Sequence, residues 1–283
     1  MVAFLNNEFL PIEHAKLHIS DLAIQRGYGI FDFFRVQELI PLYLDDYLDR
    51  FYSSAAYMGL QGLIPRAELK PIIYELIERN KIAEAGMKMI LTGGYSPDAY
   101  LPVQANLIIT QHVLTMPTEA QLSNGIKIIT HAYRRDLPTA KTINYTMGVW
   151  LQKKVKEAGA ADVLYHLDGE ISEFPRCNFF LVTADGRLVT PDKNILHGIT
   201  RKKILQAARQ EFEVEERTVS LNDLQGATEV FLTSTTKRIL PIVQVDNTSV
   251  GDGKPGSITQ RLMRLLAEVE KQEIEKALHS QPK

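Results

Sequence analysis

The chain has little of what cross-linking, membrane insertion and nucleic-acid binding require. Cys177 is the only cysteine among 283 residues, which excludes an internal disulfide and a metal site built from several cysteines. No apolar run approaches the ~18 residues of a membrane span, and the first residues do not resemble a signal peptide. The formal charge of −2 gives no electrostatic basis for nucleic acid or a membrane as partner. These absences predict a soluble, cytoplasmic protein.

The motifs of several enzyme classes are also missing. The seven histidines form neither an H-E-x-x-H motif nor a cluster with cysteine, so no metal site is expected. Neither a G-x-S-x-G nucleophile elbow nor a G-x-x-x-x-G-K-[ST] phosphate loop occurs. Gly27 and Gly29 match half of a dinucleotide-binding motif, but no third glycine follows at the required spacing. A dinucleotide site is therefore not favoured.

What is present predicts a mixed α/β chain of the α+β kind, rich in hairpins. Turns at Asn6-Asn7, Asp168-Gly169 and Asp185-Gly186 separate apolar runs and predict β-hairpins. Apolar periodicity predicts helices over 45–60, 66–82, 145–160, 198–212 and 257–280, the fourth with Thr200 as its N-cap.

One stretch, TMPTEAQLSNG, is polar and poor in aliphatic residues, which is typical of a linker. We therefore predict a smaller N-terminal α/β domain at 1–114, a linker at 115–125 and a larger, hairpin-rich domain at 126–283.

Three features together suit pyridoxal phosphate. Lys141 precedes the helix predicted at 145–160, whose dipole would favour an uncharged, nucleophilic amine. Glu173 lies between Ile171 and Phe174 at the end of a hairpin strand, where a part-buried carboxylate needs a cationic partner. Residues 197–200 open a helix and residues 233–236 form a hydroxyl-rich turn, and both suit a phosphate. Taken singly, each is more often a solvated lysine, a structural carboxylate, an N-cap or a surface turn.

The order of the motifs along the chain favours a cofactor site over these separate structural roles. LDRFYSSA, KTINY, E-x-x-x-x-N within ISEFPRCNFFLV, HGITRKKIL and EVFLTSTT follow one another over about 190 residues. At these residues the chain resembles the class IV (fold type IV) pyridoxal-phosphate-dependent aminotransferases. That family includes branched-chain and D-amino acid aminotransferases and aminodeoxychorismate lyase. The resemblance implies a two-domain fold and a homodimer that exchanges an amino group between an amino acid and a 2-oxo acid.

The resemblance also implies a role for individual residues. Lys141 would bind pyridoxal 5'-phosphate as a Schiff base and move the proton at Cα. Glu173 would keep the ring nitrogen protonated, and Arg50 would bind the phosphate unless it pairs with Asp46 on its own helix. The other cofactor contacts implied are those of Tyr145, Asn178, Ile199, Thr200, Thr235 and Thr236.

The substrate side departs from both groups of relatives. Asp98 and Tyr100 stand where D-specific relatives have arginine and histidine, and Gly86 and Lys88 stand roughly where branched-chain relatives have tyrosine and arginine. Because Asp98 cannot bind a carboxylate, another cation is required.

We predict that two cations, Arg26 and Lys88, bind the substrate carboxylate. Arg26 could instead pair with Asp21 or Asp32, and Lys88 could face solvent. An aromatic wall is predicted to receive an apolar side chain, and its members are Tyr28, Phe31 and Tyr95.

An aminotransferase for branched-chain or similar apolar amino acids is favoured. A D-amino acid (D-alanine-type) aminotransferase and aminodeoxychorismate lyase are the alternatives. The joint presence of Lys141 and Glu173 argues against an inactive relative. Because the residues available to bind the substrate carboxylate differ from those of both the branched-chain and the D-amino acid enzymes, the sequence does not predict whether L- or D-amino acids are used.

Overall fold

The computed structural model describes residues 1–280 and divides into two compact units. Unit 1 contains Met1–Leu114, Ala140–Asn144 and the end of the last helix from Glu273, and unit 2 contains Thr115–Thr139 and Tyr145–Gln272. This membership differs from the predicted division. The expected linker belongs to unit 2 and carries a helix, and the segment around Lys141 belongs to unit 1.

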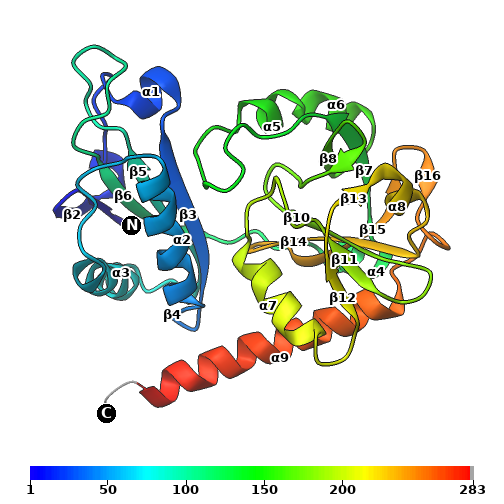
Figure 1. The fold of residues 1–283 in the computed structure, drawn as a ribbon. Helices are drawn as coiled ribbons and strands as arrows, with labels where there is room; N and C mark the ends of the chain where they lie inside the picture. The colour runs from blue at the N-terminus through cyan, green and yellow to red at the C-terminus, as the bar shows by residue number, and fades with distance from the viewer. Residues whose placement is uncertain (281–283) are drawn as a thin grey trace. The chain divides into compact units, whose positions relative to one another are not determined.

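Unit 1 is built on an antiparallel sheet with the strand order β2-β1-β6-β5-β3-β4 (Figure 1). Its strands are β1 (Val2–Leu5), β2 (Glu8–Pro11), β3 (Gly29–Gln37), β4 (Ile40–Pro41), β5 (Glu84–Thr92) and β6 (Leu107–Val113). The hairpin predicted at Asn6-Asn7 is confirmed, and Asn6 takes the positive φ of 55° that such a turn needs.

The helices of unit 1 are η1 (Ile12–His14), α1 (Leu22–Arg26), α2 (Leu44–Tyr57) and α3 (Arg66–Asn80). Helix α2 packs against β3, and α3 packs against β1 and β6. Alternation along β3 places Ile30, Phe34 and Val36 in the core, fully buried. Phe31 and Phe33 point to the opposite face, which we call the Phe31 face. Lys88 lies on the same face, because it pairs directly with Phe33 across β5.

Unit 2 contains a larger mixed sheet with the order β12-β11-β10-β14-β15-β7-β8-β9-β13, and β16 pairs with β15. Its strands are β7 (Ile126–Ala132), β8 (Asp162–Leu167), β9 (Glu170–Ile171), β10 (Asn178–Val182), β11 (Leu188–Thr190), β12 (Val214–Glu216), β13 (Val219–Ser220), β14 (Glu229–Ser234), β15 (Arg238–Val245) and β16 (Thr248–Ser249). Both predicted Asp-Gly hairpins are present, and the glycines at 169 and 186 have φ of 80° and 84°.

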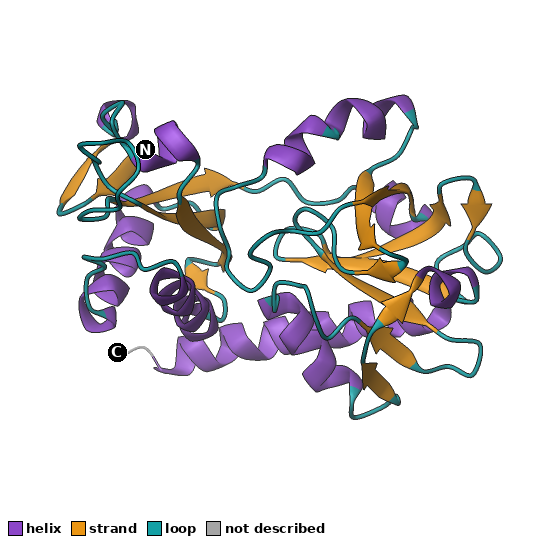
Figure 2. Cartoon of the chain, turned by 45° about the horizontal axis from the view of Figure 1, so that its top comes forward, coloured by secondary structure: helices purple, strands orange, loops and turns teal. Residues whose placement is uncertain are grey.

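The helices of unit 2 are α4 (Glu119–Asn124), α5 (Thr146–Trp150), α6 (Gln152–Glu157), α7 (Ile199–Ala208), α8 (Leu221–Gln225) and α9 (Ser257–Ser280), of which the residues from 273 are assigned to unit 1. Helices α7 and α9 pack on one face of the sheet around Phe180 and Phe231 (Figure 2). A second apolar cluster, which includes Phe179 and Leu232, fills the other face. Strands β10 and β14 are therefore buried on both sides, which explains their continuous apolar sequence.

The helix predicted at 145–160 is present as α5 and α6, which meet at Leu151. Leu151 keeps helical dihedral angles, and the N–H groups of Leu151 and Val155 donate to the carbonyls of Met147 and Leu151 at 3.0 Å, so helical hydrogen bonding continues through this residue. The Leu151 side chain is buried in a small cluster with Val155 and Tyr165. The mixed α/β class is confirmed. Within residues 1–280, no helix has the length and apolar character of a membrane span.

Candidate active site

The extended segment that carries Lys141 runs beside β3 in unit 1. The Phe31 N–H donates to the Lys141 carbonyl (2.9 Å), and the Ile143 N–H donates to the Gly29 carbonyl (3.0 Å). These bonds fix the backbone on both sides of the lysine. Helix α5 begins at Thr146 with Tyr145 as its N-cap, so Lys141 precedes the helix, as predicted, but lies outside its first turn.

The ammonium group of Lys141 lies over an aromatic ring. Its Nζ is 4.7 Å from the centroid of Phe31, and the Nζ of Lys88 is 5.5 Å from the same centroid. Both distances are within the range of cation–π attraction. The structure therefore brings together Lys141, Lys88 and Phe31, three of the residues predicted from sequence.

A histidine on the Phe31 face adds no positive charge beside Lys88. Partial burial and the Lys88 ammonium both lower the pKa of His112, so its imidazole is neutral near pH 7. Its Nε2 atom lies 2.8 Å from the Thr110 hydroxyl, which is the cross-strand neighbour of Lys88.

Arg50 is held by a carboxylate from the neighbouring strand. Its Nε and Nη2 atoms donate to the two Asp32 oxygens at 2.9 and 2.7 Å, and the Asp32 side chain is fully buried. The guanidinium also lies over the Tyr47 ring. This bidentate pair fixes the orientation of Arg50.

The other residues predicted to bind substrate also belong to unit 1, and each has different contacts. Arg26 is exposed at the end of α1 and donates to the Gln25 carbonyl. The Tyr28 hydroxyl donates to the Met58 carbonyl, and Tyr95 is 42% exposed. Their roles in substrate binding stay predictions.

The acids that might have paired with Arg26 have other partners. Asp32 binds Arg50, and Asp21 accepts hydrogen bonds from Thr92 and Asn106. In the loop after β5, Asp98 accepts from backbone and side-chain groups of its own loop, and these bonds lower its pKa. Asp98 therefore organises the loop.

In unit 2, Glu173 lies at a junction of two loops. Its Oε1 accepts from Arg135 Nη1, and its Oε2 accepts from the Leu196 N–H, both at 3.0 Å. The two side chains are nearly buried, at 5% and 10% exposed. The need for a cationic partner was predicted correctly, but Arg135 itself was missed. The only signal was its place in the RRD run before the Lys141 segment, which is typical of surface loops as well.

Asn178 connects the Glu173 loop to the start of α7. It forms a bridge with Glu173, and its Nδ2 donates to the Leu196 carbonyl at 2.7 Å. A Cβ on Gly198 would overlap with the Asn178 Oδ1, so a larger residue there would require the Asn178 side chain to move. On the other side Asn178 pairs with Thr233 of β14.

The first turn of α7 presents backbone N–H groups without a side-chain cap. Gly198 is the N-cap, so the prediction that Thr200 caps the helix is wrong, and Thr200 is its second residue. Burial and Arg201 lower the pKa of His197, which leaves the imidazole neutral beside this helix end. The helix dipole and free N–H groups suit an anion.

A turn rich in hydroxyl groups connects β14 to β15. It contains Thr235 and Thr236, both half-buried, and follows Thr233. The Thr233 hydroxyl is buried and has no hydrogen-bond partner among the described residues. Tyr145, the remaining predicted cofactor residue, is the half-buried N-cap of α5.

No group of three or more histidine, cysteine, aspartate or glutamate side chains in residues 1–280 could hold a metal ion. Unit 1 thus presents an amine beside an aromatic ring, and unit 2 presents a buried carboxylate and an uncapped helix end.

Comparison with known proteins identifies the family. The family model described as amino-transferase class IV matches residues 29–245. The D-alanine aminotransferase of Bacillus licheniformis is 29% identical over 272 residues, which cover 94% of this chain and 96% of that protein. A putative branched-chain-amino-acid aminotransferase of Methanocaldococcus jannaschii is also 29% identical, covering 93% and 94%.

The fold leads to the same family. The branched-chain amino acid aminotransferase from Escherichia coli superposes with a TM-score of 0.85 at 25% identity, covering 96% of this chain and 95% of that one. The predicted fold class is therefore confirmed. Because the family model spans more than half of the sequence, the chain belongs to the class IV aminotransferases and transfers amino groups with pyridoxal phosphate.

Proposed function

We propose that the protein transfers the amino group of an amino acid with an apolar side chain to a 2-oxo acid, and that Lys88 binds the substrate carboxylate. The main support for this proposal is that the ammonium groups of Lys88 and Lys141 both lie over the Phe31 ring. In an α-amino acid the carboxylate is attached to the carbon that loses its proton. A carboxylate anchor must therefore lie close to the lysine that moves this proton.

Lys88 suits this role by its surroundings. It is half-buried, and no acidic side chain in the described part of the chain pairs with it. A carboxylate in a partly desolvated site needs a cation or several donors. Phe31 and Phe33 flank Lys88 on the same face and offer apolar surface to the substrate side chain.

The residues present also fit the cofactor. The uncapped start of α7, with Ile199 and Thr200, offers N–H groups to its phosphate, and the unpartnered Thr233 hydroxyl lies next to the turn that carries Thr235 and Thr236. We assign Arg50 to the same phosphate, oriented by Asp32. The bound cofactor would supply an aldehyde for the amino group and a ring that accepts the electrons released at Cα.

Within this assignment, the residues of the chain have distinct tasks. Lys141 binds the cofactor covalently and carries the proton to and from the substrate Cα. Glu173 stabilises the proton on the ring nitrogen. A carboxylate has about four lone-pair positions, so Glu173 can accept that hydrogen bond besides those from Arg135 and Leu196.

A substrate panel tests the proposal. The purified enzyme is assayed with L- and D-forms of alanine, valine, leucine and norvaline, each with a 2-oxo acid acceptor. Amino transfer from apolar amino acids is expected, and the panel also shows which enantiomer is used. Release of pyruvate from aminodeoxychorismate, with no transfer in any pair, would identify a lyase instead.

Replacing Lys88 with leucine should raise the KM for both amino acid and 2-oxo acid about 30-fold, because one charged hydrogen bond to a carboxylate is worth about 2 kcal/mol. Cofactor binding, measured by absorbance titration, should be unchanged. Arg26→Leu is the matched variant, since Arg26 was the second predicted anchor. A rise in KM in the Arg26 variant alone would transfer the role from Lys88 to Arg26.

The homodimer implied by the resemblance is also part of the proposal. The apolar RGYGIFDFF segment, residues 26–34, does not offer exposed surface for a subunit interface, because Ile30 and Phe34 are fully buried within unit 1. Helix α5 does offer exposed apolar surface, because the side chains of Val149 and Trp150 are 69% and 68% exposed. Exposed apolar neighbours of this kind are typical of subunit interfaces.

Light scattering at assay concentration should therefore give twice the 32.0 kDa chain mass. Val149→Asp should raise the dimer dissociation constant roughly tenfold or more, and dilution should shift the emission of Trp150, the only tryptophan, to longer wavelength. Val113→Asp, which replaces a valine 76% exposed in unit 1, is the control. A monomer that retains full activity would contradict the dimer.

A further inference from the structure

A row of apolar side chains crosses the Phe31 face of unit 1. Phe31 of β3 pairs directly with Ile90 of β5, and Ile90 pairs with Ile108 of β6. Residues directly opposite each other on neighbouring strands point to the same side of a sheet, so these side chains lie next to one another. We call them the apolar row. Its first and last strands are two strand spacings apart, which amounts to about 10 Å.

The apolar row is open, whereas the other face of the same strands is closed. Phe31, Ile90 and Ile108 are each half-buried. Their neighbours along the strands point the other way and are fully buried, as at Met89 and Ile109. The row therefore leaves apolar surface accessible to a ligand.

The apolar row begins beside the segment that carries Lys141. Thr142 pairs with Ile30 on the edge of β3 opposite β5. The Lys141 Nζ lies over the Phe31 ring, at the start of the row. Moving away from Lys141, the row therefore crosses β3, β5 and β6 in turn.

On the other side of Lys88 the same face is more polar. There β5 has Gly86, and the Phe33 ring fills the space that a Cβ of Gly86 would need. The positions of β6 opposite Lys88 and Gly86 are Thr110 and His112, whose hydroxyl and Nε2 atoms lie 2.8 Å apart. The apolar row is thus the direction from Lys88 that suits an apolar chain.

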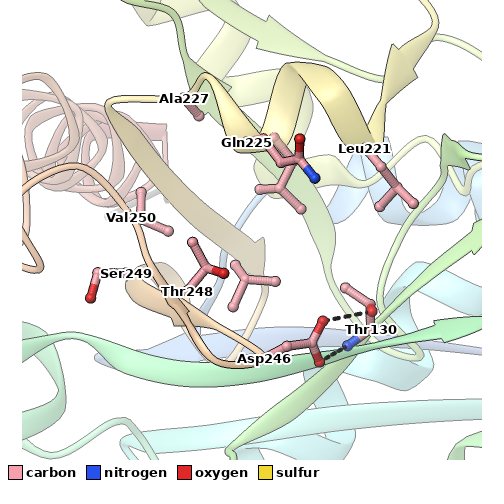
Figure 3. A pocket seen from close by; sticks show the side chains of 10 residues that line it. Thr130, Leu221, Gln225, Ala227, Asp246, Thr248, Ser249 and Val250 are labelled. Atoms are coloured by element: carbon pink, nitrogen blue, oxygen red, sulfur yellow. Dashed lines mark hydrogen bonds between the residues drawn. The ribbon is translucent and has the colours of Figure 1, made fainter.

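Unit 2 also contains an apolar cavity, of about 200 Å³, lined mainly by aliphatic side chains such as Leu221 and Val250 (Figure 3). The charged group in its lining is Asp246, which accepts hydrogen bonds from the Thr130 N–H and hydroxyl. A carboxylate in this position repels the carboxylate that every amino acid and 2-oxo acid carries. This cavity therefore suits such substrates less well than the apolar row, which has Lys88 beside it.

We propose that the substrate side chain lies along the apolar row, and that Ile90 and Ile108 determine how long a side chain the enzyme accepts. This inference rests on the proposed aminotransferase function and concerns residues of unit 1 alone. With the carboxylate at Lys88 and Cα near Lys141, a short side chain reaches only Phe31. Each added methylene covers more of the row, first at Ile90 and then at Ile108.

The test measures kcat/KM for 2-oxo acids whose unbranched side chains lengthen from pyruvate to 2-oxooctanoate. In the parent, kcat/KM should rise about fourfold for each methylene that is buried, until the row is covered. Ile108→Trp should lower the ratio of the 2-oxooctanoate value to the pyruvate value at least about tenfold. Ile90→Trp should end the rise at a shorter side chain than Ile108→Trp, because Ile90 lies one strand closer to Lys141.

Two control variants accompany the series. Ile108→Ala, which removes bulk at the same position, should show no such cutoff. Thr248→Trp places the same large ring at an exposed position in the lining of the unit 2 cavity and should leave the ratio as in the parent. No rise with length in the parent, an equal loss for all acceptors in Ile108→Trp, one common cutoff for Ile90→Trp and Ile108→Trp, or a cutoff in Thr248→Trp would overturn the proposal.

Calorimetry with unreactive acids provides a readout that does not depend on turnover. Butanoate, hexanoate and octanoate should bind the holoenzyme with increasing affinity, and Ile108→Trp should remove the gain at octanoate. Lys88→Leu should instead weaken all three acids by a similar factor, because each carries the same carboxylate. If no amino acid is transaminated in the substrate panel while the acids bind in this order, the proposed function fails and the assignment of the row stands. Equal affinity at every length would overturn the row and leave the proposed function intact.

Discussion

Lys141→Ala is expected to lose amino transfer by roughly 10⁴-fold or more, because the variant has no amine to bind the cofactor or to carry the Cα proton. The backbone bonds of residue 141 to Phe31 and to the Ser54 hydroxyl do not use the side chain, so the fold should be retained. Any loss of amino transfer can then be assigned to the missing amine of Lys141.

The measurement should include covalent attachment as well as rate. After addition of pyridoxal phosphate and reduction with borohydride, the parent chain should gain the cofactor mass at residue 141, and the variant should not gain it there. Lys153→Ala, which removes a side chain 85% exposed on α6, is the control for lysine loss. A variant that keeps both the visible absorption and the turnover would show that Lys141 is not the cofactor lysine.

Glu173→Gln is expected to lower kcat by about 10²-fold or more, because a neutral amide does not hold the ring nitrogen protonated. The structure predicts a second effect. Both Glu173 oxygens accept hydrogen bonds, from Arg135 and from the Leu196 N–H, so an amide NH₂ would face one of these donors. A mismatch of this kind costs about 1–3 kcal/mol of folding free energy.

Activity must therefore be compared per folded molecule, with chemical denaturation measured in parallel. Glu170→Gln is the control, because Glu170 lies in the same hairpin and pairs with a neighbouring arginine, Arg134. A Glu173 variant with a near-normal kcat would show that the carboxylate only holds its loops together.

The sequence predicted the features that depend on neighbours along the chain. The Asp-Gly hairpins were correct because glycine adopts positive φ without strain, and this requirement is local. The burial of Glu173 was predicted correctly because Ile171 and Phe174, close to it along the chain, are apolar and buried. The ordered motifs led to the family for a related reason, since each motif is a short stretch with fixed spacing.

The cap of α7 was predicted incorrectly. The sequence favoured Thr200 because a threonine hydroxyl is a common N-cap, but the helix begins at Ile199 after Gly198, without a side-chain cap. Asn178 of β10 lies against Gly198 and leaves little room for a Cβ there. A contact with a residue this distant in sequence is not contained in a local helical pattern.

The ordered motifs, hairpins and alternating apolar residues determined the family, the fold class and the candidates Lys141 and Glu173. Only the tertiary structure decided the partners: Asp32 for Arg50, Arg135 for Glu173, and Phe31 for both Lys88 and Lys141. The reason is physical. Backbone dihedrals and side-chain periodicity are set over a few residues, whereas an ion pair between β3 and α2, or a cation over a ring, depends on strand register and on how helices pack against the sheet.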